Sequence, residues 1–160
     1  MRLLETLAKL CAILAGLLLT AITLVTCASL IGRNTNGVTL VGDYELTAVA
    51  AGAAIALFLP WCQFRRSNIL VDFFTAKASV QTQRRLDRFG AFVLGLCVGL
   101  LAWRTAIGGI EAWHTQSGTM MLGFPEWIVY AVMAPALALT AAIAFGQAVV
   151  GVEGTSEHPA

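Results

Sequence analysis

The stretch LCAILAGLLLTAITLVTCASLIG, residues 10–32, contains 23 residues and no charged side chain. A helix rises about 1.5 Å per residue, so roughly 20 such residues cross the hydrocarbon core of a bilayer. The apolar region of a secretory signal peptide is shorter, at about 7–15 residues. We therefore predict that residues 7–31 form a first membrane span that is not cleaved.

Three further apolar segments are long enough to cross a bilayer as helices, and they cover residues 44–64, 89–112 and 126–150. Charged residues make up 12% of the 160-residue chain, whereas a soluble domain carries about 25%. Because lipid offers no hydrogen-bond partners, the backbone of each span must satisfy itself as a helix. The strict alternation of a membrane barrel strand is absent. The sequence predicts an all-α membrane protein with four transmembrane helices in a single integral membrane domain, residues 1–160.

Basic residues are distributed unevenly between the two sides of these spans. Eight of the ten Lys and Arg residues lie near the N-terminus or in the loop 65–88. Since cytoplasmic loops carry an excess of Lys and Arg, we predict that this loop and both termini, including the short tail 151–160, are cytoplasmic. Four arginines of the loop are the expected topology anchors, which would meet anionic lipid headgroups: Arg65, Arg66, Arg84 and Arg85.

The loop between the second and third spans has a pattern of its own. On a helix that starts at Ile69, Asp72 and Ser79 fall on a polar face, whereas Phe73 and Val80 fall on an apolar face. Basic residues bracket the segment on both sides. This pattern is typical of an amphipathic helix in the membrane interface. The alternative is a cytoplasmic hairpin that packs its apolar face on the spans.

The sequence offers few side chains for catalysis or for binding a cofactor. Both histidines, His114 and His158, lie outside the spans, and the four cysteines have no CxxC spacing. HExxH, a glycine-rich phosphate loop and GxSxG are all absent. A net charge of +1 gives no strong field for nucleic acid. We predict a chain that is not an enzyme and that has no catalytic residues, metal, cofactor or nucleic-acid partner.

Four charged residues near the predicted outer side are candidate functional residues. Asp43 and Glu45 lie at the mouth of the second span, where they would contact a partner or a binding protein. The alternative is that they complement the dipole at the start of a helix. Arg104 lies near the outer end of the third span, and Glu111 follows two turns later. This pair predicts an ion pair or a headgroup contact at the outer interface.

Two other sequence features concern how the spans pack and what they carry. Gly95 and Gly99 form a small-xxx-small step in the third span. Such a step predicts close helix packing, either within the chain or with a larger partner. The middle of all four spans lacks Asp, Glu, Lys and His. An ion or proton pathway tends to need such residues, so the spans themselves mark no transport path.

Three strings of this sequence resemble one family of membrane proteins. They are GDYELT at residues 42–47, LPWCQFRRSNILVDFFT at residues 59–75 and MMLGFPEWIVY at residues 120–130. In their order and spacing they resemble the DctQ-like small permease subunit of TRAP (tripartite ATP-independent periplasmic) transporters. The resemblance covers nearly the whole chain, and its most specific part runs from Leu59 to Asp72.

The resemblance implies a role in a complex of the bacterial inner membrane. In this family, the substrate and sodium sites belong to a large permease subunit, and a periplasmic substrate-binding protein delivers the solute. The small subunit is implied to scaffold the large permease during sodium-driven uptake of an organic acid or a similar solute. The expected partners are therefore the large TRAP permease subunit, the periplasmic binding protein and the lipid bilayer.

Two other functions are compatible with four apolar helices. A self-sufficient small oligomeric transporter would need a polar or ionisable residue facing a pore. A membrane anchor subunit of another complex, such as a redox complex, would need haem-binding histidines or a quinone site. The spans supply neither feature.

Overall fold

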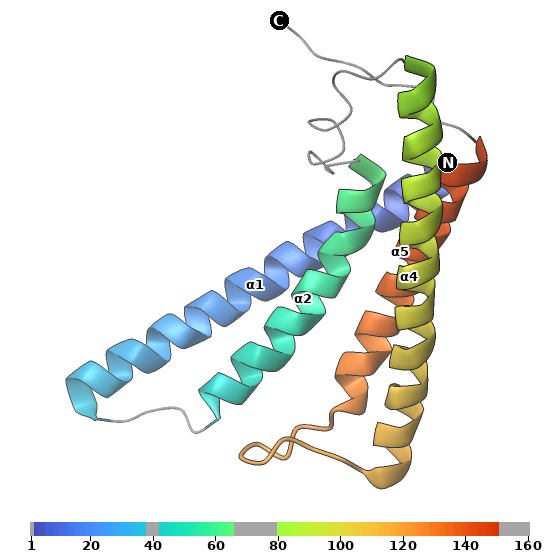
Figure 1. Cartoon of the computed structure of the whole chain (residues 1–160). Coiled ribbons are helices and arrows are strands. Elements are labelled where there is room, and N and C mark those ends of the chain that lie inside the picture. The colour runs from blue at the N-terminus through green and yellow to red at the C-terminus, as the bar shows by residue number, and fades with distance from the viewer. Residues whose placement is uncertain (1, 38–41, 66–79, 151–160) are drawn as a thin grey trace, which may run out of the picture.

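In the residues that it describes, the computed structural model has four α-helices, which run alternately up and down (Figure 1). They are α1 (Arg2–Asn36), α2 (Asp43–Arg65), α4 (Val80–Thr115) and α5 (Trp127–Val150). The structure describes residues 2–37, 42–65 and 80–150. Each helix contains a segment long and apolar enough to cross a membrane. The predicted all-α fold with four spanning helices is thus confirmed, while most of the predicted interfacial helix lies outside the described residues.

Helix α4 begins earlier than the predicted third span. It starts at Val80, so residues 80–88, which the sequence analysis assigned to the loop and to the interfacial segment, continue the spanning helix. With 36 residues it is about 54 Å long, compared with a hydrocarbon core of about 30 Å. The helix therefore projects well beyond the apolar layer, and Arg85 and Arg88 near its start are exposed.

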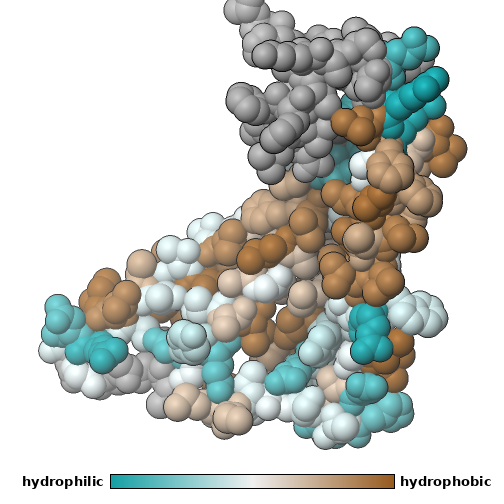
Figure 2. All heavy atoms as spheres, viewed as in Figure 1, coloured by the Kyte–Doolittle hydropathy of each residue, from teal (hydrophilic) through white to brown (hydrophobic). Residues whose placement is uncertain are grey.

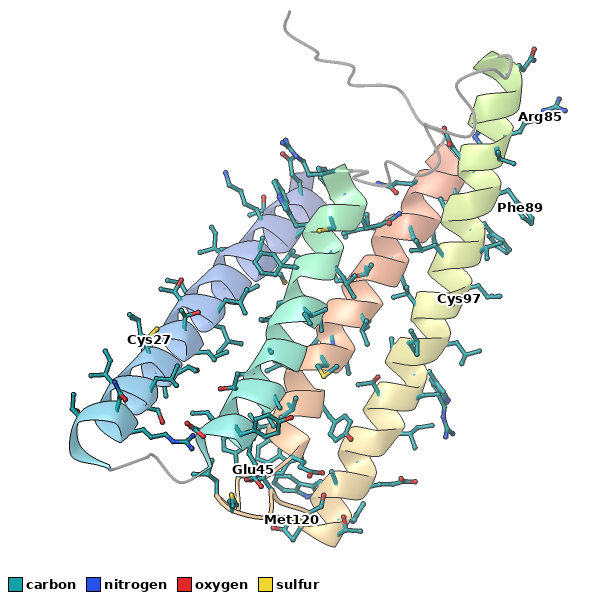
Figure 3. All side chains as sticks on the ribbon, turned by 60° about the vertical axis from the view of Figure 1, so that its left-hand side comes forward. Cys27, Glu45, Arg85, Phe89, Cys97 and Met120 are labelled. Carbon is teal, nitrogen blue, oxygen red and sulfur yellow. The ribbon has the colours of Figure 1, made fainter. Side chains whose placement is uncertain are left out.

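The four helices form an open row. Helix α1 packs on α2, α2 packs on α5, and α5 packs on α4, which leaves α1 and α4 at the two edges (Figure 3). In the most apolar window of α1 and of α4 only 11% of the residues are buried, compared with 22% in α2 and 33% in α5. Figure 2 shows hydrophobic side chains over the middle of the helices and hydrophilic ones toward their ends. The edge helices thus present most of their apolar surface outward.

The helices contact one another mainly through small side chains. The core shared by α1, α2 and α5 consists of Ala15, Ala56, Leu57 and Ala136. In lipid, small residues allow backbones to approach closely, so that dispersion and weak hydrogen bonds hold the helices together. Gly95 and Gly99 follow this rule. They face α5, where an added Cβ on Gly95 would lie 3.4 Å from the side chains of Ala144 and Phe145.

Large apolar side chains project from both edges of the row. A surface of this kind is rare on a soluble monomer, and in a membrane protein it is covered by lipid or by another protein. Phe89 on α4 points away from the other helices (Figure 3). Fifteen such residues are at least half exposed: Leu3, Leu10, Ile13, Leu14, Leu17, Leu24, Leu30 and Ile31 on α1, and Phe89, Leu96, Leu100, Leu101, Trp103, Ile110 and Trp113 on α4.

Candidate functional site

A short hairpin connects α4 to α5 at one end of the molecule. Gly118 and Pro125 form an antiparallel β-bridge, and Thr119 N–H donates to the Phe124 carbonyl at 3.0 Å. Gly123 closes the tip with a φ of 61°, a left-handed conformation that glycine adopts without strain. We call residues 117–126 the hairpin, and the end of the molecule where it lies the hairpin end.

Glu45, in the first turn of α2, holds the tip of the hairpin. Its two carboxylate oxygens accept the N–H of Met121 at 3.0 and 3.1 Å, and one of them also accepts the N–H of Leu122 at 3.2 Å. Hydrogen bonds to an ionised carboxylate are stronger than those between neutral groups. Glu45 therefore ties the start of α2 to a loop 76 residues away in the sequence. Figure 3 shows Glu45 and Met120 close together at this end.

Gly42 completes the junction between α2 and the hairpin. Its φ is 84°, and its carbonyl accepts the N–H of Leu46 at 3.0 Å. An added Cβ would lie 2.5 Å from Cγ of Leu122. Glycine is thus required at position 42 for two reasons: the backbone is left-handed, and the Leu122 side chain lies too close for a Cβ atom.

Two polar contacts join α1 to α2 near the same end. The Ser29 hydroxyl donates to Oδ2 of Asp43 at 2.6 Å, and the Thr26 and Thr47 hydroxyl oxygens lie 3.3 Å apart. Ser29 is buried, so its bond to a carboxylate is shielded from water. Asp43 and Glu45 are therefore both engaged within the chain, Asp43 with α1 and Glu45 with the hairpin. Their predicted role as contacts for another protein stays a prediction.

The opposite end of the molecule carries a polar contact between the two central helices. Gln63 of α2 and Gln147 of α5 bond to each other through their side-chain amides at 2.9 Å. Close by, the Arg65 guanidinium carbon lies 5.7 Å from the centre of the Trp61 ring, within cation–π range.

Among the predicted lipid anchors, Arg65 ends α2 with an exposed side chain, and Arg85 is exposed on α4. Arg84 also lies in α4, whereas Arg66 is outside the described residues. Arg104 and Glu111 are both exposed on α4. In the part of the chain that the structure describes, no ion pair joins Arg104 to Glu111. A contact between Arg104 and lipid headgroups stays a prediction. The exposed side chain of Arg104 is compatible with it.

Aromatic side chains gather at the hairpin end. Trp113 at the end of α4 and Trp127 at the start of α5 meet edge to face, with ring centroids 4.7 Å apart. Tyr44, in the first turn of α2, is largely exposed. Because Trp and Tyr combine an apolar ring with a polar tip, they favour the boundary between hydrocarbon and water. The hairpin end is therefore suited to lie at a membrane surface.

The described residues contain no arrangement typical of a metal site. Within residues 2–37, 42–65 and 80–150, no group of three or more His, Cys, Asp and Glu side chains lies close enough to hold an ion. All four cysteines are free thiols: Cys27, Cys62 and Cys97 are exposed, and Cys11 is half-buried. The polar groups described above bind other parts of the same chain.

The family model for tripartite ATP-independent periplasmic transporters, DctQ component, matches residues 22–154. The chain belongs to the DctQ family. The match includes the last part of α1 and the whole of α2, α4 and α5. It confirms the resemblance seen in the three sequence strings. Searches against curated proteins and against solved structures return no match.

Membership of the DctQ family makes the chain a small permease subunit of a TRAP transporter and a multi-pass inner-membrane protein. The family is a transporter component and not a family of enzymes.

The bond from Glu45 to the hairpin could not be predicted from the sequence. The one signal that points to it is the uncharged stretch 115–125, in which Gly118 and Gly123 mark a turn.

Proposed function

We propose that this DctQ component scaffolds the large permease of a TRAP transporter. The transporter carries out sodium-driven uptake of an organic acid or a similar solute, which a periplasmic binding protein delivers. The observation that carries the proposal is the absence of Asp, Glu, Lys and His from the middle of all four spans. A chain without such residues has no evident place to bind a coupling ion, so that task falls to its partner.

The open row of helices supports a scaffolding role. A closed four-helix bundle would bury its apolar side chains inside itself. Here both edge helices expose theirs, while the central contacts rest on alanine and glycine. Helix association in lipid relies on close packing and not on the hydrophobic effect, so a broad apolar edge is suited to a larger membrane protein. Lipid would cover the remaining surface.

The distribution of charge supports an orientation for this scaffold. Arg65 and Arg85 lie at the end opposite the hairpin, with exposed side chains. Together with Arg66 and Arg84 they favour a cytoplasmic position for that end. Both termini are then cytoplasmic, and the hairpin end faces the periplasm, where the binding protein arrives.

Uptake into proteoliposomes tests the proposal. A large TRAP permease subunit is reconstituted with its binding protein, with and without the chain, and solute entry is measured under an inward sodium gradient. We expect sodium-dependent entry only when all three proteins are present. Entry through this chain alone, or full activity of the permease without it, would contradict the scaffold role.

A variant of Arg104 provides the matched control. Arg104 is the ionisable residue nearest to the middle of a span. If the transport path lies in the partner, Arg104→Gln retains sodium-dependent uptake at close to the parental rate. A complete loss of uptake with an intact complex would instead place a transport step in this chain.

A further inference from the structure

The tip of the hairpin presents three consecutive apolar side chains to its surroundings. Met120 is fully exposed, Met121 is 69% exposed and Leu122 is 48% exposed. Residues 115–125 contain no charged side chain. In water, such a tip would be an unfavourable surface, since nothing in the described part of the chain covers the two methionines.

Five backbone N–H groups of the tip are already paired without water. The N–H of Thr119 donates to the Phe124 carbonyl, that of Gly123 to the Thr119 carbonyl at 2.9 Å, and that of Phe124 to the Thr119 hydroxyl at 3.1 Å. The N–H groups of Met121 and Leu122 donate to Glu45. An unpaired N–H is costly in an apolar medium, so this pairing allows the tip to leave water.

The tip is also fixed in place before it meets anything. The Glu45 carboxylate holds its backbone from one side, and the Leu122 side chain lies against Gly42. A segment that is already ordered loses little conformational entropy when it binds. The methionines are thus presented on a rigid support at the first turn of α2.

The tip continues a surface that is suited to the membrane boundary. Tyr44 precedes Glu45 and is 83% exposed, and Trp113 lies at the end of α4 just before the hairpin and is 53% exposed. These are the side chains that favour the headgroup region. The exposed methionines therefore extend an aromatic rim at the hairpin end.

We propose that Met120 and Met121 insert into the boundary between headgroups and acyl chains of the bilayer, so that the hairpin is a membrane anchor. A soluble partner is a poorer fit, because docking of a soluble protein relies on complementary charge for steering and register. The tip has no charge, and the carboxylate of Glu45 is occupied by backbone N–H groups. The flexible thioether of methionine suits a fluid and irregular surrounding. The inference goes beyond the proposed function, and it rests only on the chain spanning a membrane.

Spin labels at single cysteines test the position of the tip. Cys11, Cys27, Cys62 and Cys97 are replaced by alanine, and cysteine is introduced by Met120→Cys or Met121→Cys. Two matched controls on α4 calibrate depth: Leu100→Cys for the hydrocarbon and Gln81→Cys for water, since both positions are exposed. Collision with oxygen and with a water-soluble nickel chelate is then measured in proteoliposomes.

We expect the labels at positions 120 and 121 to collide more with oxygen than with the chelate, at a depth between the two controls. The same depth should be found with the chain alone and in complex with the large permease. Accessibility to the chelate equal to that at Gln81 would overturn the inference. Protection that appears only after a binding protein is added would also overturn it, in favour of protein docking.

A second measurement uses the chain without substitutions. In nanodiscs both membrane faces are open to a water-soluble oxidant, so methionine oxidation reports exposure to water. Met120 and Met121 should oxidise more slowly than a free methionine peptide and faster than Met133, which lies within α5. Oxidation of both at the rate of a free methionine peptide would contradict insertion. If the tip lies in lipid but the chain forms no complex with a permease, this inference holds and the proposed function fails. If the tip lies in water while the complex is active, the proposed function holds and this inference fails.

Discussion

Gln63 of α2 and Gln147 of α5 exchange two hydrogen bonds. Gln63 Nε2 donates to Gln147 Oε1 at 2.9 Å, and Gln147 Nε2 donates to the Gln63 carbonyl at 3.0 Å. Gln63 is buried, although glutamine is a costly residue to bury in an apolar medium without partners. The pair therefore satisfies two amides at once and fixes the rotation of the two central helices relative to each other.

Replacing both glutamines by leucine isolates the energy of this contact. In a double-mutant cycle of Gln63→Leu and Gln147→Leu, we expect a coupling energy of about 0.6 kcal/mol and at most about 1.7 kcal/mol, the range found for side-chain hydrogen bonds in membranes. Each single change should destabilise by more than this coupling energy, because Gln63→Leu leaves Gln147 Oε1 without a donor and Gln147→Leu leaves Gln63 Nε2 without an acceptor. Unfolding in mixed micelles measures the effect. Gln81→Leu at an exposed position is the control, and additive single effects would show that the bond contributes nothing.

Gly109 sets the distance between α4 and α5. An added Cβ would lie 2.9 Å from Cβ of Tyr130, which can move only with its backbone, so Gly109→Ala forces the helices apart. We expect a loss of roughly 1–3 kcal/mol in the free energy of unfolding, the usual cost of overpacking. Gly108→Ala is the matched control, because its Cβ would meet the Tyr130 ring at an ordinary 3.6 Å. Equal stability of the two variants would refute the close approach.

Ser29 stabilises the contact between the edge helix α1 and α2. Its hydroxyl donates to the Asp43 carboxylate, so Ser29→Ala should lower the free energy of unfolding by about 1 kcal/mol. Thr20→Ala is a suitable comparison, because the Thr20 hydroxyl donates only to the Gly16 carbonyl of its own helix. Distances between spin labels on α1 and α2 should broaden in the Ser29 variant alone. An unchanged distance distribution together with unchanged stability would argue against the bond.

Glu45 holds the hairpin, and its removal should loosen the tip. In Glu45→Ala, amide hydrogen exchange at Met121 and Leu122 should accelerate markedly, because both N–H groups lose their acceptor. Glu45→Gln should show a smaller effect, since one carbonyl oxygen remains to accept. Glu111→Gln, at an exposed position, controls for the loss of a charge. Exchange that is as slow in Glu45→Ala as in the parent would show that the carboxylate does not hold the tip.

The fold could be predicted because lipid leaves few choices. A charge-free run of about 20 residues must form a helix that satisfies its own backbone, so each span could be located from composition alone. Composition could not locate the start of α4 at Val80, because it detects only the part of a helix that lies in lipid. Its first turns contain Arg84, Arg85 and Arg88, and such charged turns lie outside the hydrocarbon, where apolar content no longer distinguishes helix from loop.

The contacts at the hairpin end were harder to predict. Glu45 could be seen as a carboxylate at a helix start, but its bond to Met121 depends on how α2 lies against the loop between α4 and α5. Such a contact between distant segments leaves no periodic signal in the sequence. The missing ion pair between Arg104 and Glu111 has a simpler cause. Seven residues place them two turns apart on one exposed helix, where each side chain is free to seek water or headgroups.

Co-purification tests whether the chain binds a large permease. The tagged chain is expressed with the large permease and extracted into lipid nanodiscs, and the composition of the particles is measured by mass. The account predicts a stable one-to-one complex, held through the apolar edges of the helix row. Recovery of a homo-oligomer alone, with no permease under any lipid composition, would contradict the scaffold role.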